Sequence, residues 1–318
     1  MTRLRYRFEY WLVRLTMWLA RRCPWRMTRA MGAGVGRLFH LFDRRHRRIA
    51  LANLAAAFPH RARADRRAIA RGVFVHFGRL LFELMKFSGL TREQMLSRVE
   101  WEGERWADAA YAAGRGVLFF TGHFGYWEIQ AIAHAAASNR SIGVLARALD
   151  NPALHELLEQ IRGCTGNFSI YRRGAIRRVL RTLQSNQSVA IMIDQHIQAP
   201  DAVTVSFFDR PASTTLALAM LARRTGAAVI PVFAVPSEGG GYNVEYLPEI
   251  VPRRSDDRDA DLADLTQRCT SLIEQQVRRH PEAWLWMHER WKTRPRPAKP
   301  HPAPPRTGTP GSRPAEGP

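Results

Sequence analysis

The chain has 318 residues, 46% of them hydrophobic, which is enough to bury a large core and excludes a wholly disordered protein. Its 48 basic residues outnumber 28 acidic ones, and the net charge of +20 predicts an acidic partner: nucleic acid, an anionic membrane or an acidic protein. Cys23, Cys164 and Cys269 are far apart, so we expect a reducing compartment and neither a disulfide framework nor a zinc site.

The N-terminal segment, residues 1–40, combines many arginines with tryptophan and tyrosine. Its apolar stretch, 10–20, is short and interrupted for a bilayer span, and it lacks the small-residue cleavage site of a signal peptide. Aromatic side chains flanked by arginines are typical of a helix that lies in the membrane interface. We therefore expect a membrane-associating helix. A shallow or tilted anchor, and a helix packed on the protein's own core, are the alternatives.

The rest of the chain predicts an α/β protein with a mainly helical first hundred residues. We expect helices over 153–163, 174–185, 213–225 and 260–280, and strands over 116–120, 141–146, 188–194, 227–235 and 242–247. This alternation is typical of a largely parallel central sheet flanked by helices, here over residues 41–294. The proline-rich residues 295–318 predict a disordered tail. The glycines of "MGAGVGR" (31–37) follow no strand, so they predict close helix packing rather than dinucleotide binding.

One histidine is distinguished by the elements around it. An acid follows a histidine by five residues three times, where chance gives about one match, at His60/Asp65, His123/Glu128 and His196/Asp201. Only His123 lies in a turn ("TGHFG") between a strand-like run and a helix-like one. Because residues five apart do not share a helix face, contact requires His123 ahead of the helix and Glu128 in its first turn. The carboxylate would then raise the basicity of the imidazole; otherwise it only favours the helix N-terminus.

Five further blocks accompany this motif along residues 40–294. They are "RRHRRIALANLAAAFP" (44–59), "LDNPALHELLEQIR" (149–162), "SVAIMIDQH" (188–196), "VSFFDRPASTTLALAMLARRTGAAVIPVF" (205–233) and "WLWMHERWKTRP" (284–295). Together with "GRGVLFFTGHFGYWE", they resemble the bacterial lipid A late (lauroyl/myristoyl) acyltransferases, within the H-x4-D/E lysophospholipid acyltransferase superfamily. Two positions differ from that pattern. Asp194-Gln195-His196 stands where some members have D-x-D, and Asp209 stands where they have the glycine of "FFG".

The resemblance implies transfer of a fatty acyl chain from an acyl thioester to a hydroxyl of a membrane lipid. It makes His123 the general base and Glu128 the acid that orients it, with Arg162 near that acid. It implies neither a serine or cysteine nucleophile nor a metal or cofactor, so we expect direct attack without an acyl-enzyme. The further residues expected to contact substrate are Arg147, for a headgroup or phosphate, Asp194, Thr214 and Thr215.

The resemblance also implies partners and a location. The donor would be acyl carrier protein or acyl-CoA, and the acceptor a lipid A precursor, with a glycolipid or an aminolipid as alternatives. The enzyme would work at the cytoplasmic face of the bacterial inner membrane, where an anionic surface suits the basic chain. A non-catalytic basic protein that binds anionic membrane or nucleic acid is the competing function, although no nucleic-acid motif is present. A hydrolase is the third possible function.

Overall fold

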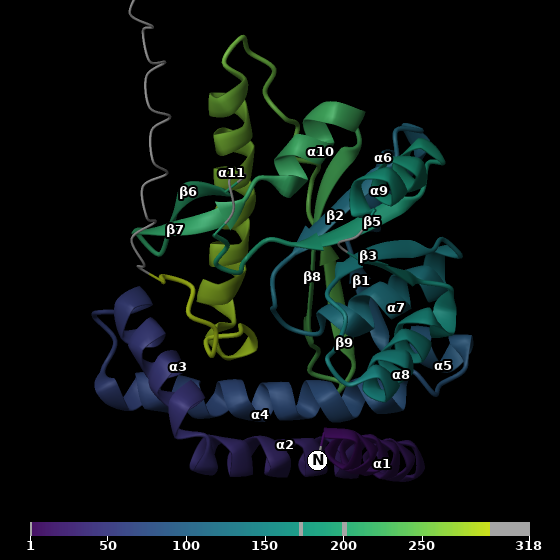
Figure 1. The fold of residues 1–318 in the computed structure, drawn as a ribbon, viewed down its shortest axis with the longest axis vertical. Helices are drawn as coiled ribbons and strands as arrows, with labels where there is room; N and C mark the ends of the chain where they lie inside the picture. The colour runs from purple at the N-terminus through teal and green to yellow at the C-terminus, as the bar shows by residue number, and fades with distance from the viewer. Residues whose placement is uncertain (1, 172–173, 199–201, 293–318) are drawn as a thin grey trace, which may run out of the picture.

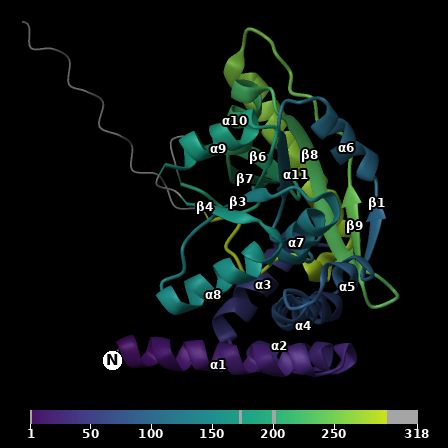
Figure 2. The ribbon, with the colours of Figure 1, turned by 90° about the vertical axis from the view of Figure 1, so that its right-hand side faces the viewer.

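A computed structural model describes residues 2–171, 174–198 and 202–292. The predicted tail, 295–318, lies outside the described residues, as does Asp201. Five helices open the chain and confirm the helical first hundred residues: α1 (Thr2–Arg22), α2 (Trp25–Phe42), α3 (Arg44–Ala57), α4 (Arg63–Phe87) and α5 (Arg92–Leu96). Helices α1 and α2 form a bottom layer beneath α4 (Figure 1, Figure 2), and α1 also contacts the start of α8 (Pro152–Arg162), where Asn151 donates to the carbonyl of Tyr6 (3.0 Å). In the described part of the chain, no helix holds an apolar stretch long enough to cross a bilayer.

The α/β prediction is confirmed by a seven-stranded sheet. Its spatial order is β1 (Val99–Glu102), β9 (Tyr242–Tyr246), β8 (Ala228–Pro236), β2 (Val117–Thr121), β5 (Ser188–Met192), β3 (Ile142–Ala146) and β4 (Phe168–Tyr171). All neighbouring pairs are parallel except β8 and β9. The central strand β2 pairs with β5, with Thr121 opposite Met192. The residues that follow these two strands therefore emerge side by side at one edge, where α/β proteins bind their ligands.

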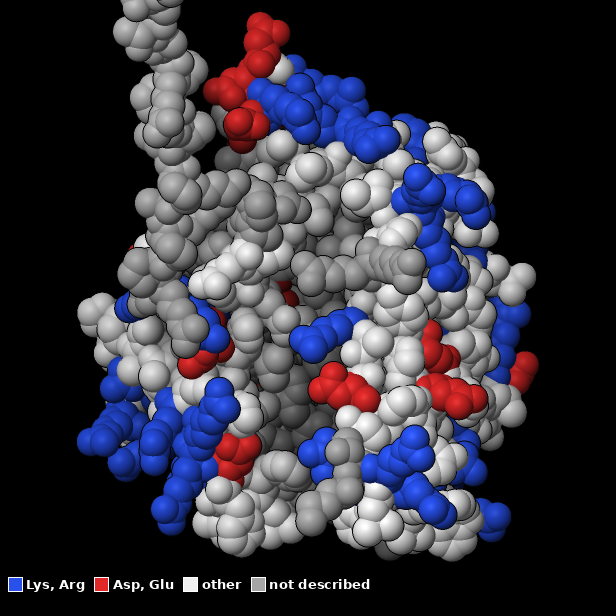
Figure 3. Space-filling model, in the orientation of Figure 1, with Lys and Arg blue, Asp and Glu red and all other residues white. Residues whose placement is uncertain are grey.

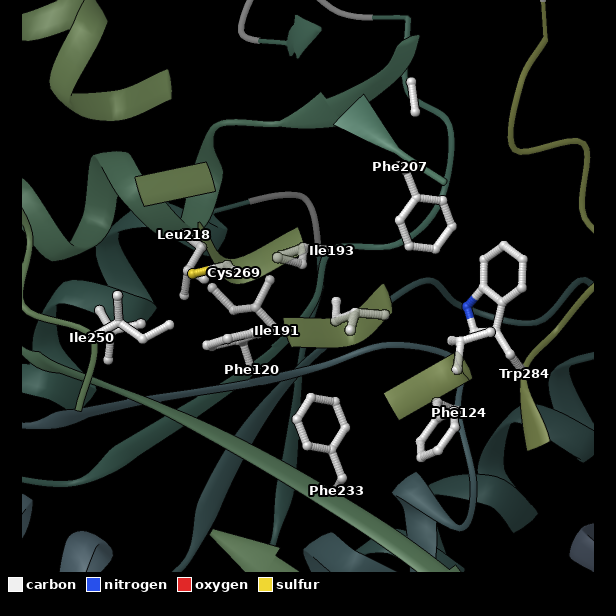
Figure 4. Close-up of a cluster of buried hydrophobic side chains, with 14 of the residues drawn as sticks. Phe120, Phe124, Ile191, Ile193, Phe207, Leu218, Phe233, Ile250, Cys269 and Trp284 are labelled. Carbon is white, nitrogen blue, oxygen red and sulfur yellow. The ribbon is translucent and has the colours of Figure 1, made fainter. Parts of the chain in front are cut away.

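Helices cover both faces of this sheet, and each face has its own apolar core. One face carries α3, α9 (Ala175–Gln184), α10 (Ala217–Thr225), α11 (Arg258–Arg279) and the first half of α4; the other carries α1, α5, α6 (Glu104–Ala112), α7 (Trp127–Ser138), α8 (Pro152–Arg162) and the second half of α4. Along β2, Phe120 joins the first core and Phe119 the second, as the two-residue period of a strand requires. Figure 4 shows Phe120 of the first core with Ile191 and Phe233 from the neighbouring strands.

One element was predicted wrongly at its start. The helix expected over 213–225 begins only at Ala217, because residues 210–215 form β7 (Arg210–Thr215), which pairs antiparallel with β6 (Ala202–Phe207). Phe208 and Asp209 make the turn between them with φ of 54° and 56°, the left-handed pair that a tight hairpin needs. Asp209 thus occupies the turn position where the family pattern has glycine, and aspartate is among the residues that tolerate this conformation.

The glycines of "MGAGVGR" pack α2 against α4, as predicted. A Cβ added at Gly36 would lie 2.2 Å from the carbonyl oxygen of Phe74, and one added at Gly78 would lie 2.2 Å from that of Gly32. The two backbones therefore approach closely over about one turn of each helix.

Candidate active site

His123 lies in the turn between β2 and α7, ahead of the helix as predicted. Gly125 has a φ of +59°, and its N–H donates to the carbonyl of Ala283 (2.8 Å). The N–H of Tyr126 donates to the carbonyl of Ala234 in β8 (2.9 Å), and the carbonyl of His123 accepts from Leu285 (3.0 Å). Backbone hydrogen bonds to β8 and to the 283–285 segment thus fix the position of the imidazole.

The structure gives the His123 ring a different carboxylate partner from the expected Glu128. The Nδ1 of His123 lies 2.8 Å from the Oδ1 of Asp194, two residues past the end of β5, and the carboxylate is 2% exposed. Asp194 was expected to contact substrate. Its Oδ2 accepts from the backbone N–H of His123 (2.7 Å) and from the indole N–H of Trp284 (2.8 Å). Because β2 and β5 are neighbours, the carboxylate that reaches His123 comes from the next strand rather than from the next helix.

The charges of this pair alter the pKa of each partner. Burial lowers the pKa of His123, but the Asp194 carboxylate, its hydrogen bond and the charge of Glu128 outweigh burial and raise that pKa above its ordinary value. Burial raises the pKa of Asp194, but His123 and Trp284 outweigh it and keep the pKa low. Asp194 is therefore an ionised acceptor at neutral pH. It holds a proton on Nδ1 and leaves Nε2 as the basic atom of the ring.

Glu128 pairs instead with Arg162, in the first turn of α7 and the last turn of α8. Its two oxygens accept from Nε (2.9 Å) and Nη2 (2.5 Å) of Arg162, and both side chains are nearly buried. Burial lowers the pKa of Arg162, but Glu128 outweighs it and raises that pKa, so Arg162 is a cation at neutral pH. Arg162 therefore lies beside the acid of the motif, as expected, while no hydrogen bond among the described residues joins Glu128 to His123.

The other expected substrate residues have partners other than His123. Arg147 is on the surface, with its side chain 92% exposed and 4.0 Å from Asp150. Thr214 is buried and accepts from Nη2 of Arg290 (2.5 Å), and the hydroxyl of Thr215 accepts from the N–H of Ala217. Both threonines thus fix the β7 region and are not brought to His123.

Sequence reasoning missed Trp284 and Arg290, although both lie in the terminal block that carried part of the resemblance. Trp284 holds the carboxylate of Asp194. Arg290 is fully buried and donates to the carbonyl of Ser213 (2.6 Å) as well as to Thr214. Burial lowers its pKa to about 10, and Asp194 opposes this effect, so Arg290 is a cation near the carboxylate at neutral pH. The signal that could have found them is the presence of tryptophan and arginine in a C-terminal block that ends at a proline-rich tail.

Side chains of helix α4 hydrogen-bond to the turn that carries His123 (residues 122–126), which we call the catalytic turn of the candidate site. The buried Nε2 of His76 lies 3.1 Å from the carbonyl oxygen of Gly125; burial lowers the pKa of His76 to about 4, so the ring is neutral and Nε2–H donates. About two turns further along α4, the carboxylate of the fully buried Glu83 accepts from the hydroxyl of Tyr126 (3.0 Å) and from that of Tyr242 in β9 (2.6 Å). Arg29 of α2 also reaches Glu83, at 3.2 Å. Through Glu83, α2 and α4 are joined to the turn that carries His123.

The two tyrosines on Glu83 allow a matched prediction. Tyr126→Phe and Tyr242→Phe each remove one hydroxyl from the same carboxylate, so each should lower the free energy of unfolding by about 1–3 kcal/mol. Only Tyr126 belongs to the catalytic turn. We expect Tyr126→Phe to lower kcat by about tenfold, which corresponds to about 1.4 kcal/mol of barrier, and Tyr242→Phe to have a much smaller effect. Denaturant unfolding and steady-state turnover of both variants check this, and equal kcat values would contradict it.

An apolar pocket opens beside Glu128 and Trp127. It runs between β2, β3, β5 and α7. Its lining includes Phe119, Ile142, Val144, Ala190, Met192 and Val232, and buried His134 and Tyr246 close it with a mutual hydrogen bond (2.6 Å). Such a pocket suits a hydrocarbon chain. In the described residues, no group of three or more histidine, cysteine or acidic side chains is arranged to hold a metal ion.

Comparison with known proteins gives this site its context. The family model described as bacterial lipid A biosynthesis acyltransferase matches residues 1–293. The chain belongs to that family. It is 28% identical to the lipid A biosynthesis lauroyltransferase of Escherichia coli K12 over 294 residues, which is 90% of this chain and 93% of the relative. It is 27% identical to the lipid A biosynthesis palmitoleoyltransferase of the same organism, with the same coverage. A phosphatidylinositol mannoside acyltransferase of Mycobacterium tuberculosis is 26% identical over 58% of this chain and 57% of its own. The protein is thus an acyltransferase, and membership of this family implies an acyl donor and a lipid acceptor.

Proposed function

We propose that this enzyme transfers a fatty acyl chain from a thioester to a hydroxyl of a lipid A precursor, with His123 as general base. The observation that carries the proposal is the His123–Asp194 pair beside an apolar pocket, in a chain of this family. A glycosylated phosphatidylinositol is the second acceptor, favoured by the similarity to the mycobacterial enzyme.

The proposed reaction needs no group other than the side chains and the two substrates. Nε2 of His123 takes the proton of the acceptor hydroxyl as its oxygen attacks the thioester carbonyl. Asp194 stabilises the imidazolium that forms. The C–O bond forms, the C–S bond breaks, and the thiolate leaves with the proton from Nε2. Cys269 is not suited as a nucleophile, because burial raises the pKa of its thiol well above the ordinary value.

Glu128 and Arg162 are proposed to act at the entrance of the donor pocket. Glu128 lines that pocket, and Arg162 neutralises its charge so that a hydrocarbon chain can lie beside it. Glu128 also raises the pKa of His123 from a distance, which makes the base stronger. Glu128 would therefore position the acyl donor and raise the pKa of His123. It would not orient the imidazole ring.

The bottom layer of the molecule is proposed to rest on an anionic membrane, at the cytoplasmic face of the inner membrane. Helices α1 and α2 expose large apolar side chains: Leu4, Phe8, Trp11, Leu12, Leu15, Trp18, Met27, Leu38, Phe39, Leu41 and Phe42. Lysine and arginine side chains gather over α3 and the first turns of α4, just above this layer (Figure 3). Two interactions hold such a surface on a bilayer: apolar side chains contact the acyl chains, and basic side chains attract the anionic headgroups.

Mass spectrometry of the reaction products tests the proposed function. Purified full chain is incubated with a lipid A precursor and either acyl carrier protein or CoA as the acyl donor. We expect the acceptor to gain one acyl chain, and a folded His123→Ala variant to lose at least a hundredfold in rate. Unchanged transfer by His123→Ala would rule out the assigned base. Release of free fatty acid at the same rate without lipid would indicate a hydrolase, and no turnover with either donor would favour a binding protein.

A further inference from the structure

We propose that a second apolar groove, between α2 and α4, binds an acyl chain of the acceptor lipid and brings its hydroxyl to His123. This inference rests on the proposed function. The groove is a surface hollow where the two helices meet. Its apolar lining comes from both helices and from the segment after α11: Val35, Phe39, Phe74, Phe77, Leu81 and Met287.

The outer end of the groove opens toward the proposed membrane. Phe39 and Leu81 are 60% and 47% exposed, and Phe39 lies between Leu38 and Leu41 on the exposed face of α2. A hydrocarbon chain could therefore enter the groove from the bilayer and contact mainly apolar side chains, with Asp43 the one charged residue of the lining. A lipid that enters in this way need not cross water.

The groove is connected to His123 through two ring contacts, because Phe77 of its lining packs on Trp127 and Trp127 packs on His123. The ring of Phe77 packs on that of Trp127, with centroids 5.9 Å apart, and Trp127 packs edge-on against His123 at 5.5 Å. On the other side, Met287 follows Trp284 by three residues, and Trp284 holds the carboxylate of Asp194. A hollow lies on this face above α4, between the 284–291 segment and α8 (Figure 3). A hydroxyl carried on a chain in the groove would reach the base from this hollow.

The shapes of the two cavities favour the acceptor over the donor in this groove. Trp127 lines the pocket beside Glu128 and also contacts Phe77, so it stands between that pocket and the groove. The pocket beside Glu128 is closed at its far end by His134 and Tyr246 and suits the single chain of a thioester. The groove has the exposed side chains of Phe39 and Leu81 in its lining, as a lipid that stays partly in the membrane requires.

Charge on the other flank of this helix pair suits a membrane surface that carries phosphates. Arg37 of α2 and Arg71 of α4 line a hollow on the opposite flank of the same helix pair, and Arg47 and Arg67 line a second hollow beside it. These guanidinium groups would lie near headgroup depth if α2 rests on the membrane. Arginine forms paired hydrogen bonds with phosphate oxygens, so this flank could hold lipid phosphates at the membrane surface, on the side of the helix pair away from the groove.

Two phenylalanines on α2 give a matched test. Phe39 lines the groove, whereas Phe42 is 74% exposed on the same helix and lies outside it. Phe39→Glu and Phe42→Glu are compared in detergent micelles that hold a lipid A precursor, with the KM for acceptor and donor measured separately. We expect Phe39→Glu to raise the acceptor KM at least fivefold more than Phe42→Glu does, with the donor KM within twofold of wild type. Leu81→Trp, which fills the groove without adding charge, should act like Phe39→Glu.

A second substrate separates loss of the groove from loss of folding. A water-soluble acceptor with the same hydroxyl but without long chains should be acylated at similar rates by wild type, Phe39→Glu and Leu81→Trp. Equal effects of Phe39→Glu and Phe42→Glu on the acceptor KM, or a rise in the donor KM alone, would overturn the groove assignment. Failure of the wild-type enzyme to acylate either acceptor would instead count against the proposed function.

Discussion

Asp194→Asn should lower kcat for acyl transfer by about 10²–10⁴-fold, the range that general-base catalysis contributes. The reason lies in the three donors around the carboxylate. Oδ2 accepts from both the N–H of His123 and the indole of Trp284, so the amide oxygen of asparagine must take that place. Its NH2 group then faces Nδ1 of His123 and donates to it. The ring proton moves to Nε2, which can no longer accept a proton from the acceptor.

Glu128→Gln is the matched control for this prediction. Glutamine keeps one oxygen for Arg162 and leaves the Asp194–His123 hydrogen bond in place, so we expect kcat to fall by less than tenfold. Steady-state turnover of both variants, with circular dichroism to confirm folding, provides the comparison. A larger loss in Glu128→Gln than in Asp194→Asn would mean that Glu128 is the working partner of His123.

Gly125→Ala should remove most activity and lower the free energy of unfolding by about 2–5 kcal/mol. A non-glycine residue at a φ of +59° costs about 1–2 kcal/mol. In addition, the new Cβ would lie 1.7 Å from the carbonyl oxygen of Ala234, and an overpacked site adds about 1–3 kcal/mol. That carbonyl cannot move freely, because it accepts from the N–H of Tyr126. The turn must shift instead, and His123 shifts with it.

Gly114→Ala isolates the contribution of the close contact. Gly114 follows α6 with a φ of +70°, and a Cβ there would meet no atom within 4 Å. We therefore expect only the conformational cost of about 1–2 kcal/mol and unchanged kcat. Denaturant unfolding of the two variants measures the difference. Equal stability losses would show that the turn can accommodate a side chain.

The turn that carries His123 could be located from the sequence, but the partner of this histidine could not. A strand-like run before His123 and a helix-like run after it were local signals, and the turn lies where they predicted. The partner depends on which strands are neighbours, which is a non-local property. Asp194 and His123 each follow their strand by two residues, and only the pairing of β2 with β5 brings them together. Glu128 matched the family motif, yet its position on α7 directs it to Arg162 of α8.

The fold was predicted where elements are long and periodic. The five predicted strands match β2, β3, β5, β8 and β9 within two residues, because each contains an apolar or alternating run. The edge strands β1 and β4 have only four residues each and carry too short a pattern. The helix expected from residue 213 begins later, because Ser213 to Thr215 pair with β6. The cross-strand hydrogen bonds there outweigh the helical propensity of the run that follows.

The dependence of kcat/KM on pH tests the assignment of His123 most directly. A general base must be unprotonated, so activity is lost as the pH falls through its pKa. Because Asp194 and Glu128 raise the pKa of His123, we predict an acid limb with an apparent pKa above the ordinary histidine value of about 6.5. We also predict that Glu128→Gln moves this limb to lower pH. A limb near 4, where carboxylates titrate, or a rate that does not depend on pH between 5 and 8, would contradict His123 as the base.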